Sequence, residues 1–289
     1  MQLRVLSLIA LLAACGSDDA ANARRFELRV YGVDARPVDG EIPDEEAVRQ
    51  RIQEAVRISK AFVDPRHLDA PVLATRIGVG EVASAAGSRV LRVEVDATVP
   101  DELHATLGTA VDATIELERV DGRIVPAEDV PEALGRAVAV LDAKLSLVTG
   151  DESDARRLLG DPDPEIVVLA LEHTQRQRWR QLADDVAAVL PGTDPRVTIA
   201  AVGCLGEIGR PEHARAMLEH VRLADTAQAQ RLYEALAAVG GDEAAAFLEF
   251  AARNEDDPTM ADVAERALRR LQTRPEVADV DPTLRGHRP

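Results

Sequence analysis

Residues 194–223 read DPRVTIAAVGCLGEIGRPEHARAMLEHVRL, and related stretches recur through the C-terminal half of the chain. Thr193 or Asp194 caps a first helix that begins at Pro195. Gly209-Arg210-Pro211 then forms a turn, and a second helix follows. The starts of four copies are spaced by 31, 31 and 32 residues: Asp163-Pro164, Asp194-Pro195, Asp225-Thr226 and Asp257-Pro258. This period predicts stacked helix pairs, because one amphipathic pair cannot bury its apolar face alone.

The four copies differ in how closely they match the quoted stretch. The copy that begins at Asp225 repeats its core positions at an offset of 31, with Leu236 in place of Leu205. The last copy keeps a single helix, Pro258–Leu271. The first copy has Thr174–Trp179 where the quoted stretch has its turn glycines. A longer or kinked helix is therefore expected in the first copy.

Three short motifs give the repeats a family resemblance. Asp194-Pro195-Arg196-Val197, Ala200-Ala201 and Leu205-Gly206-Glu207-Ile208-Gly209 resemble HEAT repeats, in particular the short kind named after bilin lyases. The resemblance covers a little over a third of the chain. It implies an α-hairpin repeat domain and is almost silent on activity.

The region before the repeats carries strand patterns and one helix. Phe26–Tyr31 alternates apolar and polar residues, as a half-buried strand does, and a helix begins at Asp44. Three further strands are predicted at Pro71–Val82, Val90–Val99 and Ala110–Val120. Each strand has one apolar face. The predicted fold class is therefore an α+β domain, an antiparallel sheet with a helix on one face, followed by an all-α HEAT-like α-hairpin repeat domain.

The junction between the two regions is helical. An amphipathic helix is predicted at Val130–Leu147 and a short one at Ser153–Leu159. The pair could cap the repeat array, since terminal repeats are usually atypical, or could belong to the first domain. We place the boundary after residue 126, which gives an α+β domain over residues 26–126 and a repeat domain over residues 127–271. The tail, residues 272–289, contains three prolines and is predicted to be disordered.

The N-terminal residues 1–15, MQLRVLSLIALLAAC, contain one charge, Arg4, and an almost unbroken apolar run. The run is too short to span a bilayer but has the length of the apolar part of a signal peptide. Its end, Leu12-Ala13-Ala14-Cys15, resembles the lipobox of bacterial lipoproteins. The alternative is an ordinary secretory signal in which Cys15 has no special role. Residues 16–25 are polar and are predicted to be a flexible tether.

The resemblance to lipoproteins implies a membrane anchor on Cys15. In that family the cysteine carries a thioether-linked diacylglycerol, and cleavage before it frees an amine for a further acyl chain such as palmitate. Two or more acyl chains hold a protein stably on a membrane. The expected location is the bacterial cell envelope. Gly16 and Ser17 follow the cysteine where an aspartate would mark the inner membrane, which favours the periplasmic face of the outer membrane.

Composition limits both the core and the partners. Aromatic residues make up 2% of the chain, so the core must consist of alanine, valine, leucine and isoleucine side chains. The net charge of −17 predicts repulsion from nucleic acid. The expected partners are the membrane, through the lipid on Cys15, and an unidentified envelope protein.

The histidines, the second cysteine and the carboxylates form no pattern that predicts a catalytic, cofactor or metal site. His213 and His220 are seven residues apart, whereas two zinc-binding histidines on one helix are spaced by four. Cys204 falls on the apolar stripe of its helix and is predicted to be an inert core residue. Carboxylates at alternate positions of the predicted strands fit a solvated sheet face: Asp96, Asp112, Glu116 and Glu118.

One cluster combines arginines with the only tryptophan. Arg176, Arg178 and Arg180 surround Trp179, a combination that can stack on bases. On a helix the three arginines do not share one face, and the net charge opposes nucleic acid. Trp179 is instead expected to lie in the core between repeats.

These observations predict a lipid-anchored, non-enzymatic protein of the cell envelope. Its repeats would act as a scaffold or adaptor for a protein partner. Two alternatives remain open: an enzyme or chromophore lyase of the HEAT-repeat type, and a small-ligand receptor with a pocket between the two domains.

Overall fold

The computed structural model describes residues 26–63, 70–83, 88–119, 123–192, 194–220 and 226–273. The chain divides into two compact units: the first ends at Leu158, and the second begins at Leu159. The predicted signal peptide, the tether and Cys15 lie outside the described residues, as does the tail from residue 274 onward. No helix among the described residues has both the length and the apolar character needed to cross a membrane.

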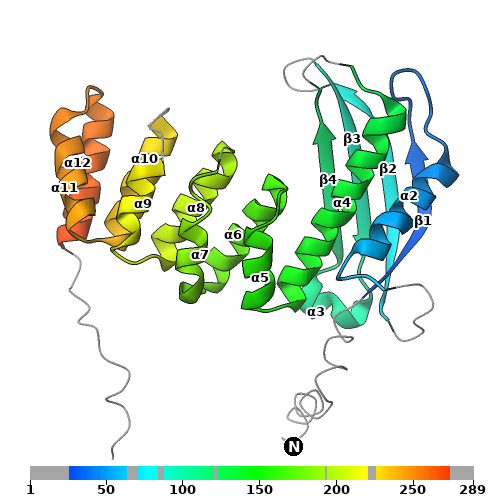
Figure 1. Ribbon diagram of the computed structural model, residues 1–289, viewed down its shortest axis with the longest axis horizontal. Helices are drawn as coiled ribbons and strands as arrows, with labels where there is room; N and C mark the ends of the chain where they lie inside the picture. Colours follow the sequence, from blue (N-terminus) through cyan, green and yellow to red (C-terminus); the bar gives the residue numbers. More distant parts are fainter. Residues whose placement is uncertain are drawn as a thin grey trace, which may run out of the picture. The chain divides into compact units, whose positions relative to one another are not determined.

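The first unit is built on a four-stranded sheet whose strand order follows the chain (Figure 1). The strands are β1 (Glu27–Ala35), β2 (Val72–Ala83), β3 (Arg89–Thr98) and β4 (Ala110–Leu117). β3 is antiparallel to both β2 and β4, whereas β1 and β2 are parallel. The predicted α+β class is confirmed, with the refinement that the sheet is mixed. A parallel pair needs a crossover, and helix α2 between β1 and β2 supplies it.

Two helices cover one face of the sheet, and the other face meets solvent. α2 (Glu45–Ile58) begins as predicted, because the side chain of Asp44 accepts a hydrogen bond of 2.9 Å from the backbone N–H of Ala47. α4 (Pro126–Thr149) packs against β3, β4 and α2. The connection from β3 to β4 contains two short helical turns, η1 (Asp101–Leu103) and α3 (His104–Leu107).

The position of α4 moves the boundary between the two units. The prediction placed this helix in the repeat domain and ended the first domain at residue 126. The first compact unit instead extends to Leu158, because α4 buries its apolar face on the sheet and on α2. Leu134, Val138, Leu141 and Leu145 form that face, and each is at most 1% exposed.

A buried carboxylate fixes the start of α4. Asp129 is 1% exposed and accepts a hydrogen bond of 2.9 Å from Nε of Arg119, in the segment that follows β4. Its second oxygen accepts a hydrogen bond of 2.7 Å from the backbone N–H of Val125. Burial alone raises the pKa of Asp129, but the hydrogen bonds from Arg119 and Val125 outweigh it and hold that pKa below its usual value.

A second carboxylate ties the segment after α2 to α4. Asp142 on α4 accepts hydrogen bonds from the hydroxyl of Ser59 and from the backbone N–H groups of Lys60 and Ala61. The same segment lies beside the first described residue. Phe26 donates its backbone N–H to Ala61 at 2.8 Å and accepts from Val63 at 3.0 Å. The first described residue is thus held by the segment that Asp142 fixes in place.

The second unit is a double layer of helices that follows the predicted repeat. α6, α8, α10 and α12 pack side by side in one layer, and α7, α9 and α11 form the other (Figure 1). α5 (Glu152–Leu159) precedes them and spans the division between the units. The helices are α6 (Pro164–Gln177), α7 (Ala183–Ala187), α8 (Pro195–Ile208), α9 (His213–His220), α10 (Thr226–Val239), α11 (Asp242–Asn254) and α12 (Pro258–Gln272), with a turn η2 (Arg180–Leu182) before α7.

The Asp-Pro motifs begin helices as predicted. Asp163, Asp194 and Asp257 each accept a hydrogen bond from the backbone N–H two residues later, at 2.8 to 3.0 Å. A proline occupies the first position of each helix, where its missing N–H leaves no intrahelical bond unmade. The period of 31 or 32 residues therefore marks the starts of α6, α8 and α12.

The prediction of a longer or kinked helix in the first copy is wrong. α6 ends at Gln177 and has 14 residues, as many as α8 and α10. The helix stops because Arg178 adopts the left-handed conformation, with φ 53° and ψ 43°. A glycine usually occupies this position at the end of a helix, and its absence misled the sequence interpretation.

Replacing Arg178 with glycine is expected to stabilise the second unit by about 0.5 kcal/mol. The left-handed conformation costs a non-glycine residue about 1–2 kcal/mol. Glycine adopts it without strain but loses more conformational entropy on folding, which costs about 0.5–1 kcal/mol. The exposed ion pair of Arg178 with Glu207, at 3.7 Å, contributes little. Urea denaturation followed by circular dichroism measures the change. Glu172→Gly, at an exposed position in the interior of the same helix, is the control and should destabilise by about 1 kcal/mol.

Candidate functional site

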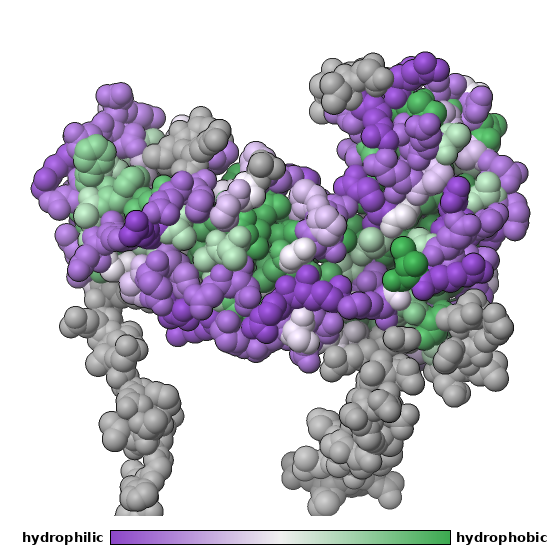
Figure 2. Space-filling view, in the orientation of Figure 1, coloured by the Kyte–Doolittle hydropathy of each residue, from purple (hydrophilic) through white to green (hydrophobic). Residues whose placement is uncertain are grey.

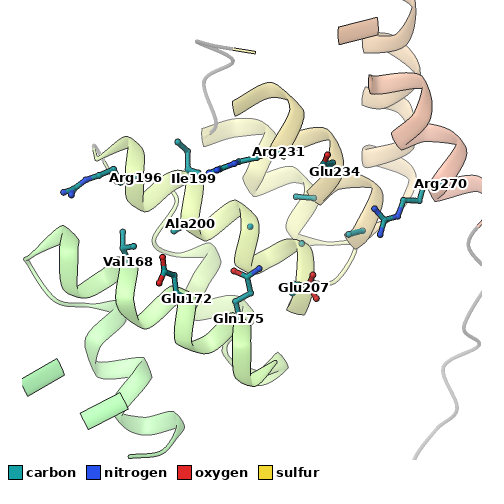
Figure 3. A pocket seen from close by; sticks show the side chains of 14 residues that line it. Val168, Glu172, Gln175, Arg196, Ile199, Ala200, Glu207, Arg231, Glu234 and Arg270 are labelled. Carbon is teal, nitrogen blue, oxygen red and sulfur yellow. The ribbon is translucent and has the colours of Figure 1, made fainter. Parts of the chain in front are cut away.

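A groove runs across the layer formed by α6, α8, α10 and α12. It has a volume of about 610 Å³ and takes lining residues from all four helices (Figure 3). Glu172 and Gln175 extend into it from α6, and Arg231 and Arg270 extend into it from α10 and α12. The remaining lining residues are Val168, Arg196, Ile199, Ala200, Gly203, Gly206, Glu207, Glu234, Ala235 and Ala238.

Two glycines of α8 shape the floor of the groove in different ways. A Cβ atom at Gly206 would lie 3.3 Å from Ala235, so this glycine lets α8 and α10 pack closely. A Cβ atom at Gly203 would meet nothing nearer than the side-chain oxygen of Gln175, at 4.0 Å. A glycine inside a helix costs about 0.5–1 kcal/mol relative to alanine. Gly203 therefore weakens α8 without a packing reason within the described residues, and it leaves a notch in the groove.

The charged groups of the groove differ in whether they have partners. Arg196 forms ion pairs with Asp194 at 3.1 Å and with Glu165 at 3.2 Å. Glu172 lies 3.8 Å from Arg176, and Glu207 lies 3.7 Å from Arg178.

By contrast, Arg231 and Arg270 form no ion pair with any residue that the structure describes. Glu234 accepts a hydrogen bond of 3.0 Å from the side-chain amide of Gln230, on its own helix. The uncompensated positive charge of the groove thus belongs to the two arginines of α10 and α12.

The cysteine of α8 does not take part in the groove. Cys204 is fully buried, which confirms its predicted place in the core. Burial, with a smaller contribution from the charge of Glu207, raises the pKa of its thiol to about 12. A thiol with this pKa is protonated at neutral pH and is a poor nucleophile.

The two helical histidines lie in different environments. His213 is 4% exposed and links α9 to α7. Its Nδ1 accepts a hydrogen bond of 2.9 Å from the backbone N–H of Arg210, so its Nε2 carries the proton that is donated to Asp184 at 2.9 Å. Both ring nitrogens are engaged, which leaves no lone pair for catalysis or metal binding. His220 is exposed, and the described residues contain no cluster that could hold a metal ion.

The sequence interpretation missed this histidine link. Hydrogen bonds from His213, and then from Arg210, lower the pKa of Asp184. The only signal in the sequence is a histidine at the start of a helix, directly after a turn. That position does not reveal a partner 29 residues away.

Trp179 is less buried than predicted. It is half-buried in the segment after α6, where its ring lies 5.3 Å from that of His173. The three arginines around it do not form one surface: Arg176 pairs with Glu172 on α6, whereas Arg178 pairs with Glu207 of α8. The end of α6 at Gln177 places Trp179 outside the helix, so it lies only partly in the core.

The carboxylates of the sheet lie on its solvent face, as predicted. Asp96 and Asp112 are exposed and stand opposite each other across β3 and β4. Glu116 pairs with Arg92 on the neighbouring strand. Figure 2 shows the same general division in both units, with hydrophilic residues on the outside and hydrophobic residues gathered between the elements.

His173 makes the second unit sensitive to acid. Burial, and then the positive charge of Arg176, lower the pKa of His173. Below pH of about 6.5 this histidine binds a proton in the unfolded chain, whereas in the folded chain it stays neutral to a lower pH. We therefore expect the free energy of unfolding to fall between pH 7 and pH 5, by at most about 1.4 kcal/mol per pH unit from this group. His173→Phe keeps a ring against Trp179 and should flatten this dependence in urea titrations, whereas His220→Gln should not.

Comparison with known proteins finds one family match, in the helical unit. Residues 183–269 match the family described as HEAT repeats. No curated protein and no solved structure matches the chain. The matched residues run from α7 to α12 and include most of the groove. The match supports the predicted HEAT-like repeats over these residues, and repeats of this kind suggest a scaffold for protein interaction.

Proposed function

We propose that this protein is a non-enzymatic adaptor, held on a membrane of the bacterial cell envelope by lipid on Cys15, and that its groove binds a segment of a partner protein. The observation that carries the proposal is the groove itself, which takes lining residues from four helices of the HEAT-type array. Surfaces built from several stacked repeats are those through which repeat proteins bind extended partners.

The chemistry of the lining supports a protein ligand. It offers guanidinium, carboxylate and amide groups above a floor of alanine and glycine. These groups can bind the polar main chain and side chains of a peptide segment. The lining residues include no serine, cysteine or histidine, and Cys204 of α8 is buried and is not among them.

The proposed anchor rests on the lipobox-like residues that end at Cys15. It would place the adaptor at the periplasmic face of the outer membrane. Incorporation of labelled palmitate tests it. We expect the wild-type chain to be labelled and Cys15→Ala to remain unlabelled. Equal labelling of the two would refute the anchor and leave the groove untouched.

Site-specific photocrosslinking in cells tests the groove. A photoreactive amino acid in place of Gln175 or Ala200 would lie in the groove, and one in place of Arg215 or Glu249 would lie on exposed positions of the other layer. We expect one discrete adduct from both groove positions and none from the two controls. Adducts of the same pattern from all four positions would contradict the proposal.

A further inference from the structure

We propose that the groove selects a partner segment that carries carboxylate side chains, which Arg231 and Arg270 bind. The inference rests on the proposed function, because it names the chemistry of the segment that the groove would hold. Its basis is the charge left uncompensated in the groove, the direction of the two arginines and the notch at Gly203.

The two arginines lack the carboxylate partners that the third arginine of the groove has. The chain has 51 acidic and 34 basic residues, so basic side chains are outnumbered by possible partners. Arg196, in the same groove, has two carboxylates within 3.2 Å. No carboxylate of the described residues lies within ion-pair distance of Arg231 or Arg270. Two guanidinium groups are therefore available to carboxylates supplied from outside.

Both arginines point into the groove. In Figure 3 the side chain of Arg231 extends from α10 toward Ile199 on α8, and that of Arg270 extends from α12 into the space that the groove occupies. A guanidinium group presents paired N–H donors that match the two oxygens of a carboxylate. An occupant lying across α8 and α10 would meet both groups.

Gly203 provides room for the main chain of the occupant. The positions 31 residues before and after it in the repeat hold Glu172 and Glu234, so only the central helix leaves a notch there. A helix glycine without a packing reason is expected where another backbone approaches closely. The flanking carboxylates can accept hydrogen bonds from main-chain N–H groups of the segment.

The same carboxylates exclude a polyanion. Glu172, Glu207 and Glu234 line the groove beside the arginines, within a chain of net charge −17. A nucleic acid or a phosphate-rich surface would meet repulsion from all of them. A peptide with one or two carboxylates, placed at the arginines and flanked by neutral residues, satisfies both sets of charges.

The test uses the purified full-length chain in detergent and an array of random 12-residue peptides. We expect the bound peptides to be enriched in aspartate and glutamate. The single variants Arg231→Ala and Arg270→Ala should each weaken binding to these peptides at least tenfold, and the double variant should weaken it further. The matched control is Arg57→Ala with Arg180→Ala, which removes the same charge from exposed positions outside the groove and should leave affinity unchanged.

Gly203→Leu separates the two proposals, because its side chain enters open space in the groove and α8 can still form. The inference is supported if the bound peptides are enriched in acidic residues, if the double arginine variant no longer binds them, and if Gly203→Leu abolishes binding. If Gly203→Leu abolishes binding but the bound peptides are not enriched in acidic residues and do not depend on the arginines, the inference is overturned. The groove then remains the binding site. Binding that Gly203→Leu does not change, or no binding at all, overturns both.

Discussion

Asp129→Ala is expected to lower the free energy of unfolding of the first unit by about 3 kcal/mol. The carboxylate is buried, and it joins Arg119 to the backbone N–H of Val125 at the start of α4. Its removal leaves that N–H without its acceptor and the guanidinium of Arg119 without its buried partner. Because α4 forms one wall of the core, the loss should reach the whole unit and not only the first turn of the helix.

Hydrogen exchange of the buried amides of α4 measures this loss without requiring the two units to unfold together. The control is Glu132→Ala, which removes the second carboxylate that Arg119 contacts, at 2.7 Å. Glu132 is exposed, so we expect its loss to cost less than about 1 kcal/mol. Equal losses from the two variants would show that burial of Asp129 contributes nothing.

His213→Ala is expected to destabilise the second unit by about 2–3 kcal/mol. The ring is buried, accepts from the backbone N–H of Arg210 and donates to Asp184 on α7. Alanine would remove both hydrogen bonds and leave a cavity where the buried ring lies. The exchange rates of amides in α7 and α9 should therefore increase together.

Two controls separate the contributions to this effect. Asp184→Ala removes one of the two hydrogen bonds of the ring, together with an exposed ion pair to Arg210 at 3.0 Å that contributes little. The carboxylate is largely exposed, so the cost should stay near 1 kcal/mol, about the value of a single hydrogen bond. His220→Ala changes an exposed histidine of the same helix and should have little effect. If His213→Ala costs no more than Asp184→Ala, the bond from Arg210 has no energetic role.

The helical layer was predictable because its signals are local. An aspartate, a proline and an apolar stripe define the start of a helix within one turn, and three of them recur at the predicted spacing. The end of α6 was not predictable in the same way. The surroundings can force a residue of any type into the left-handed conformation, and nothing in the sequence around Arg178 indicates that it adopts this conformation.

The placement of α4 and the groove depend on contacts that a sequence does not record. The apolar face of α4 would suit either the sheet or the first repeat, and only the packing distinguishes them. The groove arises where residues from four helices come together. Gly203 is visible in the sequence as a helix glycine, but only the empty space above it distinguishes it from Gly206, which packs against Ala235.

The clamp at Asp142 would have a mechanical consequence if the proposed lipid on Cys15 holds the chain. Under that proposal, a pull would reach the described residues first at Phe26. From there the load passes through two backbone hydrogen bonds to the segment around Ala61, and through Asp142 to the longest helix of the unit. These bonds would share the force between β1 and α4, and we expect β1 to resist separation from the sheet under load.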